Sequence, residues 1–475
     1  MAAVGAAAEL LSIPALTASG SYTSKRQELV TDPTGEPRLS LSLVPEVLVS
    51  RTVSSLRKAT PMPFAERVRA IAAAVELFAT QTVAGMTPEQ HATTVSRITG
   101  SPITFARGGL QRFIDAGRSV ERTIAAAAPA GVSPDPSDPQ LRDGGALWVR
   151  RGATLAMHAA GNASAIHASW LPPLALGFRV AVRPSRREPL TPYRLVTALR
   201  QCGFGEDQIA VLPTDYAGAD EMLRSADLGL VYGGEDIVAK YGNNPRISVQ
   251  GPGRSKIVIG SDVDWREHLD VIVASISAGG GANCMNASAV LIDGDASALA
   301  EAIAARLAEL PALPQLDEHA VLPVRAASLA HATESHVLGV AQGARIWLGA
   351  DGIAHEFGDG SATVMPAVFE LASAGDERVQ LEFPFPCVWV APWSYQQHGT
   401  RPLRDSLALT ALTHDQALID ELLEEPSIAS VKTGDIPTGW SAPHLPHDDY
   451  MLSFFMRAKA VRTTATSTDK PRREW

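Results

Sequence analysis

Residues 278–292 place a single cysteine, Cys284, directly after the run Gly-Gly-Gly-Ala-Asn. An amphipathic helix candidate precedes this run and a β-branched apolar segment follows it, so a turn would present the thiol. Glycine lets backbone N–H groups approach a ligand closely, and such groups lower a thiol pKa and stabilise an oxyanion. The pattern predicts a cysteine that attacks a carbonyl carbon. The alternative is a small apolar residue buried beside a tight turn, as free cysteines often are.

A second feature is Gly233-Gly234, which follows the apolar segment 228–232 and precedes a helix candidate. A strand followed by two glycines and a helix leaves backbone N–H groups free to bind a phosphate. We therefore interpret Gly233 and Gly234 as candidates for binding a nucleotide cofactor. A plain turn would use the same two residues.

The elements that must position these residues alternate between helices and short apolar strands from residue 161 onward, which is typical of a parallel sheet. Earlier in the chain residues 46–125 read as helical, with apolar residues at helical spacing over 64–78 and with Thr87 and Pro88 opening a further helix, and the proline-rich stretch 129–144 reads as a linker. Over residues 161–235 the pattern predicts strands at 178–183, 208–212 and 228–232, and helices at 191–202 and 218–225.

Composition narrows the class of protein. The chain has 475 residues, a net charge of -10 and only 19% charged residues, so it offers no basic stripe for nucleic acid. Its three cysteines lack the spacing of a disulfide framework or a zinc site, which favours a reducing cytoplasm and no metal. The N-terminus lacks a signal-peptide pattern, and the uncharged stretches 152–178 and 271–292 contain polar residues and, in the first, prolines that argue against a membrane span.

The order of the motifs along residues 50–465 resembles the aldehyde dehydrogenase superfamily. The resemblance implies an α/β fold with a Rossmann-like cofactor domain, an α/β catalytic domain and a small β oligomerisation element. The motifs that carry it are Gly161-Asn162, Arg183-Pro184-Ser185, Tyr232-Gly233-Gly234, Gln250-Gly251-Pro252-Gly253-Arg254-Ser255, Cys284, Met365-Pro366-Ala367-Val368-Phe369 and Glu382-Phe383-Pro384-Phe385-Pro386.

Four segments are expected on this basis. Residues 1–45 form an irregular N-terminal arm, 46–248 the nicotinamide cofactor domain, 249–445 the catalytic cysteine domain, and 446–475 a C-terminal oligomerisation strand and tail. A hairpin over 146–157, turning at Gly152, belongs to the oligomerisation element. The run 450–462 alternates apolar and polar residues as a strand does, and the resemblance pairs it with that hairpin and a neighbour's sheet, so a homodimer or homotetramer is expected. The alternative is an edge strand packed on its own subunit.

The resemblance also implies roles for single residues. Cys284 becomes the nucleophile, and the Asn162 side chain stabilises the oxyanion together with the Cys284 backbone N–H. Glu382 corresponds to the carboxylate that binds the nicotinamide ribose. Without the resemblance, Asn162 would be read as a turn residue and Glu382 as the solvated end of a strand.

The cofactor expectation rests on the end of the predicted strand 178–183. Where the family carries a lysine and then an acidic residue that favours NAD, this chain reads Arg183-Pro184-Ser185-Arg186-Arg187. Guanidinium groups pair well with phosphate, so NADPH is expected, with Arg183 and Arg186 nearest the 2′-phosphate and NAD as the alternative. Arg186 and Arg187 could instead be solvated residues at a turn.

Gln250 is the important departure, because hydrolytic members carry a glutamate there that deprotonates water. An amide has no useful basicity near pH 7, whereas coenzyme A brings a thiol that needs less help than water. We therefore expect NADPH-dependent reduction of an acyl thioester to an aldehyde, or the reverse reaction, with coenzyme A as co-substrate. The alternatives are a hydrolytic aldehyde dehydrogenase with another base, an acyl-phosphate reductase, or a catalytically silent structural subunit.

Overall fold

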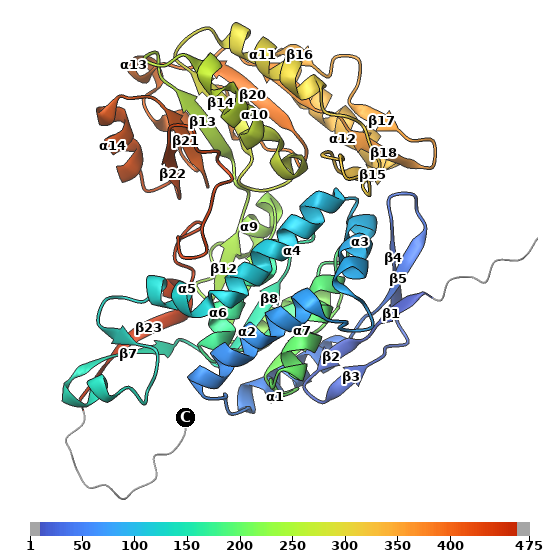
Figure 1. Cartoon of the computed structure of the whole chain (residues 1–475), viewed down its shortest axis with the longest axis vertical. Coiled ribbons are helices and arrows are strands. Elements are labelled where there is room, and N and C mark those ends of the chain that lie inside the picture. The colour runs from blue at the N-terminus through green and yellow to red at the C-terminus, as the bar shows by residue number, and fades with distance from the viewer. Residues whose placement is uncertain (1–9, 463–475) are drawn as a thin grey trace, which may run out of the picture.

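Two seven-stranded sheets form the centres of two lobes in the computed structural model, which describes residues 10–462 (Figure 1). The first sheet has the order β12-β11-β8-β9-β10-β2-β3, and its five strands from β12 to β10 run parallel. Its strands are β2 (Ala15–Thr17), β3 (Gly20–Tyr22), β8 (Thr154–His158), β9 (Arg179–Arg183), β10 (Ile209–Val211), β11 (Leu228–Tyr232) and β12 (Ile247–Gln250).

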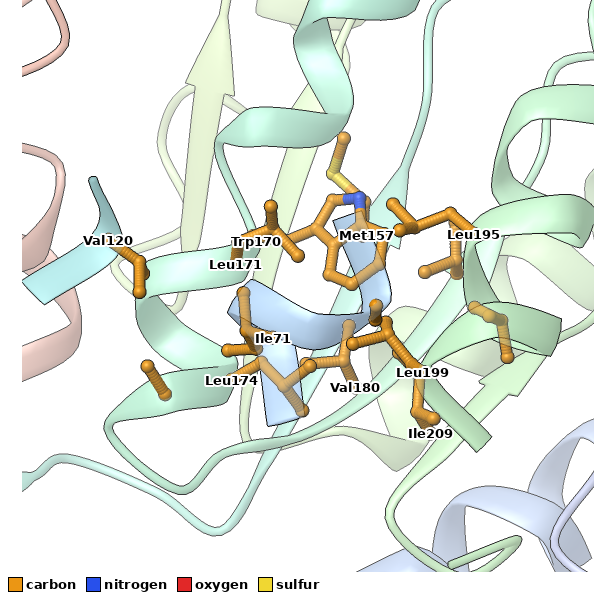
Figure 2. Packing of buried hydrophobic residues seen from close by; sticks show 14 of the residues in the cluster. Ile71, Val120, Met157, Trp170, Leu171, Leu174, Val180, Leu195, Leu199 and Ile209 are labelled. Atoms are coloured by element: carbon orange, nitrogen blue, oxygen red, sulfur yellow. The ribbon is translucent and has the colours of Figure 1, made fainter. Parts of the chain in front are cut away.

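Helices cover both faces of this sheet, which explains why its central strands are apolar throughout. Met157 of β8 packs with Trp170 in the larger core (Figure 2), which Leu155 of the same strand also joins. The intervening Ala156 joins the cluster beneath α1 and α8. The helical elements of this lobe are α1 (Glu46–Lys58), α2 (Phe64–Thr80), α3 (Pro88–Thr99), α4 (Ile103–Arg118), α5 (Val120–Ala127), η1 (Pro139–Asp143), η2 (Ser164–Ala168), α6 (Leu171–Ala175), α7 (Leu190–Gln201), α8 (Tyr216–Ser225) and α9 (Glu235–Tyr241).

The second lobe has a similar arrangement around a sheet of order β16-β19-β20-β14-β13-β21-β22. All strands of this sheet except β16 run parallel to one another. Successive residues of β13 again face different cores, with Ile257 against α10 and α11 and Val258 on the other face. The strands are β13 (Ser255–Ile259), β14 (Ala287–Ile292), β16 (Arg345–Leu348), β19 (Ala367–Glu370), β20 (Cys387–Pro392), β21 (Leu409–Leu412) and β22 (Val431–Thr433). The helical elements are η3 (Trp265–His268), α10 (Leu269–Ser277), η4 (Ala278–Gly281), α11 (Ala296–Ala308), α12 (Ala327–Val340), η5 (Glu377–Gln380), α13 (Tyr395–His398), η6 (Arg401–Leu403) and α14 (Gln416–Glu424).

The helix expected over 64–78 and the strands and helices expected over 161–235 are confirmed to within two residues at their ends. The helix start at Thr87 is a full capping box, because the Thr87 hydroxyl accepts from the Gln90 N–H while the Gln90 side chain accepts from the Thr87 N–H. The strand 228–232 is observed with the same limits as β11. The α/β fold class is therefore confirmed.

The expectation of an irregular arm over residues 1–45 is wrong for its described part, which starts at residue 10. Two of its strands, β2 and β3, extend the first sheet, with β2 antiparallel to β10. The others form a separate sheet in which Leu39 and Leu41 are buried and Ser40 lies between them. These strands are short and broken by glycine and proline, so their alternation is weak, and pairing with distant partners stabilises them. This sheet consists of β1 (Leu11–Ile13), β5 (Pro37–Ser42) and β4 (Gln27–Thr31).

The expected hairpin over 146–157 is also wrong, because its two halves belong to different sheets. β7 (Gly145–Arg150) pairs with β6 (Val132–Ser133), whereas β8 lies between β9 and β11. The chain changes sheets at Gly152, where an added Cβ would lie 2.5 Å from Cβ of Asp227. The Asp227 carboxylate accepts from the N–H groups of Ala153 and Thr154 and so fixes the start of β8.

The C-terminal segment pairs with β7 as expected, but within the same chain. It forms a short helix, α15 (Leu452–Phe455), followed by β23 (Met456–Val461), which runs antiparallel to β7 in a sheet of order β23-β7-β6 (Figure 1). The strand therefore begins later than expected. Ala458 and Ala460, expected on a buried face, are exposed in the single chain. The expected tail from residue 463 onward lies outside the described residues.

A third small sheet, of order β15-β18-β17, packs against α12. Over residues 10–462, no helix combines the length and apolar character that a membrane crossing requires. The strands of this sheet are β15 (Val324–Ala326), β17 (Ala354–Glu356) and β18 (Ser361–Val364).

Candidate active site

The Cys284 loop connects α10 to β14, as the helix, turn and strand pattern predicts. Gly279, Gly280 and Gly281 have φ values of 62°, 73° and 66°, a left-handed backbone that favours glycine. Close packing also requires glycine at position 281, since a Cβ on Gly281 would lie 2.4 Å from the backbone nitrogen of Pro386. The three glycines therefore let the chain turn sharply against its neighbours before Cys284.

Asn286 holds this turn closed, a role that sequence reasoning missed. Its side-chain amide donates to the carbonyl oxygens of Ser275 and Ala278, each at 3.0 Å. Its oxygen accepts from the Asn283 N–H at 2.9 Å. Asn286 is buried, so these three bonds link the end of α10 to the residue before Cys284.

The Cys284 thiol is protonated at neutral pH in this structure. Burial and the nearby Glu382 carboxylate raise its pKa to about 12, and Asp448 acts in the same direction. The N–H groups of Cys284 and Met285 hydrogen-bond toward the sulfur and lower the pKa, as the glycine-rich turn led us to expect, but their effect is smaller. A nucleophilic Cys284 therefore needs a group that removes its proton.

Asn162 lies beside the cysteine loop, although 120 positions separate it from the residue it contacts. It follows the carboxyl end of β8, and its amide Nδ2 donates to the Ala282 carbonyl oxygen at 3.2 Å. The contact therefore places this side-chain N–H donor against Ala282, two residues before Cys284.

Glu382 and the loop before β13 lie against the other side of Cys284. An added Cβ on Gly253 would lie 1.7 Å from the Cys284 carbonyl oxygen, and the Ser255 hydroxyl donates to that same oxygen at 2.9 Å. The Glu382 carboxylate accepts from the N–H groups of Gly253 and Arg254 at 3.0 and 2.7 Å. Burial raises the Glu382 pKa, so this residue is an enclosed carboxyl group near the thiol and not the solvated end of a strand.

Gln250 ends β12 directly opposite Tyr232 of β11. Its backbone carbonyl accepts from the Gly233 N–H at 3.1 Å, and its side-chain amide lies 3.4 Å from the Ser248 hydroxyl. Tyr232 and the Cys284 sulfur lie close enough for the thiolate to help burial raise the Tyr232 pKa. Gln250 is therefore paired in the sheet with a tyrosine that is near enough to the thiol to interact with its charge.

Gly233 and Gly234 connect β11 to α9. A Cβ on Gly233 would lie 2.3 Å from Cγ1 of Ile237, so the close approach of the helix requires glycine there. Gly234 is the N-cap residue, and the first turn of α9 carries Glu235 and Asp236. Glu235 forms an ion pair with Arg254, which links this turn to the loop beside Cys284.

Arg183, Ser185 and Arg186 form a separate cluster at the carboxyl end of β9. Both guanidinium groups lie over the ring of Tyr216, at 5.9 Å for Arg183 and 5.5 Å for Arg186. Nε of each arginine is buried without a hydrogen-bond partner among the described residues, which fits a phosphate-bearing cofactor. The Ser185 hydroxyl accepts from the Arg187 N–H at 3.2 Å and leaves no room for a side chain on Gly161.

Two features at this cluster did not follow from the sequence. Glu28 of β4 lies 3.4 Å from Nε of Arg186, so a strand of the N-terminal sheet reaches the expected cofactor end of the first lobe. Arg187 points elsewhere, because its guanidinium is 3.4 Å from the Thr99 carbonyl oxygen. Exposed Tyr216, which the two arginines share, was also missed.

Sequence reasoning missed His447 as well. Its Nε2 lies 3.9 Å from the Cys284 sulfur, and its Nδ1 lies 3.9 Å from the Asp448 carboxylate. The residues belong to the sequence Pro443-His-Leu-Pro-His-Asp-Asp449, whose density of histidine and aspartate just before the C-terminal strand is the signal that could have drawn attention to it. Within residues 10–462, no group of three or more potential metal-ligating side chains of His, Cys, Asp or Glu is found.

The structure thus brings the expected residues together in two groups. Asn162 and Glu382 both lie near the cysteine loop. Gln250 is connected to this group through its strand partner Tyr232. The arginine cluster occupies the end of β9 in the same sheet. Because parallel strands present their carboxyl ends at one edge, the ends of β8, β9, β11 and β12 all lie at the same edge of the first sheet.

The chain is similar to known proteins both in sequence and in fold. The model of the aldehyde dehydrogenase family matches residues 24–411. The aldehyde-dehydrogenase-like protein y4uC of Sinorhizobium fredii is 23% identical over 129 residues, which are 26% of this chain and 25% of that protein. The matched segment therefore spans about a quarter of that relative.

Solved structures resemble almost the whole chain at low identity. Aldehyde dehydrogenase 21 of Physcomitrella patens superimposes with a TM-score of 0.78 at 15% identity over 95% of this chain and 98% of its own. A variant of Thermus thermophilus 1-pyrroline-5-carboxylate dehydrogenase gives 0.78 at 16% identity over 95% and 93%. The indole-3-acetaldehyde dehydrogenase of P. syringae, solved with NAD+, gives 0.78 at 17% identity over 94% and 96%. The chain therefore belongs to the aldehyde dehydrogenase family, whose members are NAD(P)-dependent oxidoreductases that act on aldehydes.

Proposed function

We propose that this protein reduces an acyl-coenzyme A to an aldehyde with NADPH through an acyl-enzyme on Cys284, or catalyses the reverse, coenzyme A-dependent oxidation of an aldehyde. The observation that carries the proposal is Gln250. It ends β12 beside Tyr232 and Gly233, in the motif where hydrolytic relatives place a glutamate, and its amide cannot accept a proton from water.

The reaction follows from the groups around the sulfur. The Cys284 sulfur forms a bond to the thioester carbonyl carbon, and the Asn162 amide and the Cys284 N–H stabilise the oxyanion. Collapse breaks the bond to the coenzyme A sulfur and leaves an acyl group on Cys284. A nicotinamide cofactor held by Arg183, Arg186 and Glu382 would supply the hydride that takes this thioester to the aldehyde level. Breaking the carbon–sulfur bond to Cys284 then releases the aldehyde and restores the cysteine.

A single assay separates this proposal from its alternatives. Purified protein is given an aldehyde and NADP+ in the presence of coenzyme A, of inorganic phosphate, or of neither. Nicotinamide reduction that requires coenzyme A and yields an acyl thioester supports the proposal. Reduction that requires phosphate identifies an acyl-phosphate enzyme, and no turnover under any condition with a range of aldehydes favours a silent subunit.

Hydrolysis to a carboxylic acid is the second candidate, and His447 is the observation that favours it. Its imidazole lies near Cys284 and could take a proton from water in place of the missing glutamate. Rapid formation of free acid without any thiol acceptor would place this candidate first.

The cofactor preference rests on the arginine cluster. Arg183 and Arg186 bring two positive charges to one exposed tyrosine ring, and both have a buried Nε without a hydrogen-bond partner among residues 10–462. A 2′-phosphate would supply acceptors for both, whereas the hydroxyl of NADH would not. Glu28 opposes this preference, because its carboxylate lies beside Arg186 and must move or be neutralised when a phosphate binds.

Replacing Arg186 by alanine is expected to lower kcat/KM for NADPH by about 10- to 100-fold, the size of one charge-assisted hydrogen bond, with little change for NADH. Arg187→Ala is the matched control, because this neighbouring side chain is directed toward Thr99. Steady-state kinetics with both cofactors provides the measurement. Equal losses for NADPH and NADH in Arg186→Ala would contradict the assignment.

We further propose a homodimer or homotetramer assembled through the sheet β23-β7-β6. Within residues 10–462, β23 is an edge strand that pairs with β7 alone, and an unpaired edge readily accepts another strand. Ala458 and Ala460 share one face of this strand and are exposed in the single chain, although small apolar residues suit a contact surface.

Introducing glutamate at both Ala458 and Ala460 is expected to shift the protein toward monomers, because two charges would be buried without partners. Lys459→Glu is the control, since Lys459 lies on the opposite face of the same strand. Sedimentation velocity measures the outcome. An unchanged sedimentation coefficient in the folded double variant would place the oligomer contact elsewhere.

A further inference from the structure

His447 contacts Cys284 from a segment that lies 163 positions away in sequence. Its Nε2 approaches the sulfur to 3.9 Å, within the range of a weak hydrogen bond that involves sulfur. The opposite ring nitrogen, Nδ1, lies 3.9 Å from Oδ1 of Asp448. When Nδ1 carries the proton and faces Asp448, Nε2 is the free acceptor that faces the thiol.

The location of the ring suits proton transfer. The His447 side chain is 43% exposed, so protons can exchange with solvent from a ring whose Nε2 lies 3.9 Å from the sulfur. Burial lowers its pKa, Asp448 acts in the opposite direction, and Lys432 lowers the pKa further. At neutral pH the ring is therefore neutral and able to accept a proton.

The charges around the thiol make such a base necessary. Burial disfavours a free Cys284 thiolate most, and the negative charges of Glu382 and Asp448 disfavour it further. A thiolate formed together with an imidazolium on His447 adds no net charge to the site. The positive imidazolium therefore offsets the burial and the repulsion that together raise the thiol pKa.

We propose that His447 is a catalytic base that takes the proton of Cys284 as the sulfur attacks, and that Asp448 orients its ring. This inference rests on the proposed role of Cys284 as the nucleophile. The proton moves from Sγ to Nε2 as the bond from Sγ to the carbonyl carbon forms. Collapse of the tetrahedral adduct breaks the bond to the leaving sulfur, which takes the proton back from the imidazolium. His447 ends neutral, and no oxidant or reductant takes part.

The pH dependence of Cys284 alkylation by iodoacetamide tests this pairing. The imidazolium–thiolate pair carries the same number of protons as the neutral pair, so its population is independent of pH between the pKa values of the two groups. A lone thiolate instead forms by releasing a proton, so its population rises tenfold per pH unit below the thiol pKa. The slope of the alkylation rate against pH therefore distinguishes the ion pair from a lone thiolate.

For the wild-type protein, the alkylation rate is expected to be flat between about pH 7 and pH 9. In His447→Gln the rate should rise about tenfold per pH unit and be about 100-fold lower at pH 7, the size of a positioned base. Peptide mapping in a Cys202→Ala background assigns the adduct to Cys284, because Cys387 is buried in β20. His444→Gln, in the same segment, is the matched control and should keep the flat profile.

A wild-type rate that rises tenfold per pH unit from pH 7 overturns the inference without any variant, even if His447→Gln fails to fold. Identical profiles for the wild type and a folded His447→Gln variant overturn it as well. Alkylation needs neither coenzyme A nor nicotinamide. A flat profile that depends on His447 therefore supports the inference even if no acyl-coenzyme A is reduced. Reductase activity without that profile overturns the role of His447 and leaves the proposed function standing.

Discussion

Replacing Cys284 by alanine is expected to lower acyl transfer by about 10⁴-fold or more, because the reaction loses the atom that holds the acyl group. Neither of the other two cysteines has a comparable setting, because Cys202 is the C-cap residue of α7 and Cys387 is buried in β20. The variant should still fold, since the Asn286 bonds and the three glycines that shape the turn do not involve the sulfur. Acyl-enzyme detected by intact-protein mass spectrometry, together with turnover, provides the measurement.

Cys202→Ala is the control for this variant. Cys202 is the C-cap residue of α7 in the first lobe, and burial raises its pKa without the opposing backbone N–H hydrogen bonds that lower the Cys284 pKa. Its loss should leave both the acyl adduct and the turnover unchanged. Aldehyde formation that persists in Cys284→Ala and disappears in Cys202→Ala would show that the nucleophile has been misassigned.

Replacing Gln250 by glutamate should redirect the acyl-enzyme from coenzyme A to water. If the pocket is built as in the hydrolytic relatives, a carboxylate at this position would activate water, and a positioned base typically contributes about 100-fold or more. The backbone of Gln250 contributes its carbonyl to the Gly233 N–H, which the substitution does not alter. The measurement is the ratio of free acid to acyl thioester formed from an aldehyde at fixed coenzyme A concentration.

Gln250→Met separates the new base from the mere loss of the amide, since methionine has a similar volume and cannot accept a proton from water. Only the glutamate variant should form more acid. A wild-type enzyme that already releases acid rapidly without any thiol acceptor would show that another residue, with His447 as the first candidate, is the hydrolytic base.

His447 also changes the interpretation of Gln250. A base that serves Cys284 can act in acylation and in transfer to a thiol without a glutamate at position 250, because both steps move a proton to or from sulfur. Water is a weaker acid than a thiol and needs a base placed on its own line of attack. One imidazole beside the sulfur is therefore compatible with thiol exchange, and Gln250→Glu tests whether water can be activated from the side of β12.

Local patterns in the sequence determined several parts of this protein correctly. Capping by Thr87, the limits of β11 and the turn around Gly279–Gly281 depend on contacts between residues close in sequence or on the conformational freedom of glycine. The α/β class follows from alternating apolar strands and helices, since a strand buried on both faces must be apolar throughout. The family resemblance supplied Asn162 and Glu382 as candidates, and their roles remain predictions.

Only the tertiary structure decided which segments meet. β7 and β8 look like a hairpin because they are adjacent and short, yet Asp227 and the partner strands β23 and β9 separate them into two sheets. The strands before residue 45 depend on pairing with distant partners, which weak local alternation does not reveal. His447 reaches Cys284, and Glu28 reaches Arg186, only because the chain folds back on itself. The thiol pKa is set in the same way, because burial and the carboxylates of Glu382 and Asp448 outweigh the N–H groups that the local sequence provides.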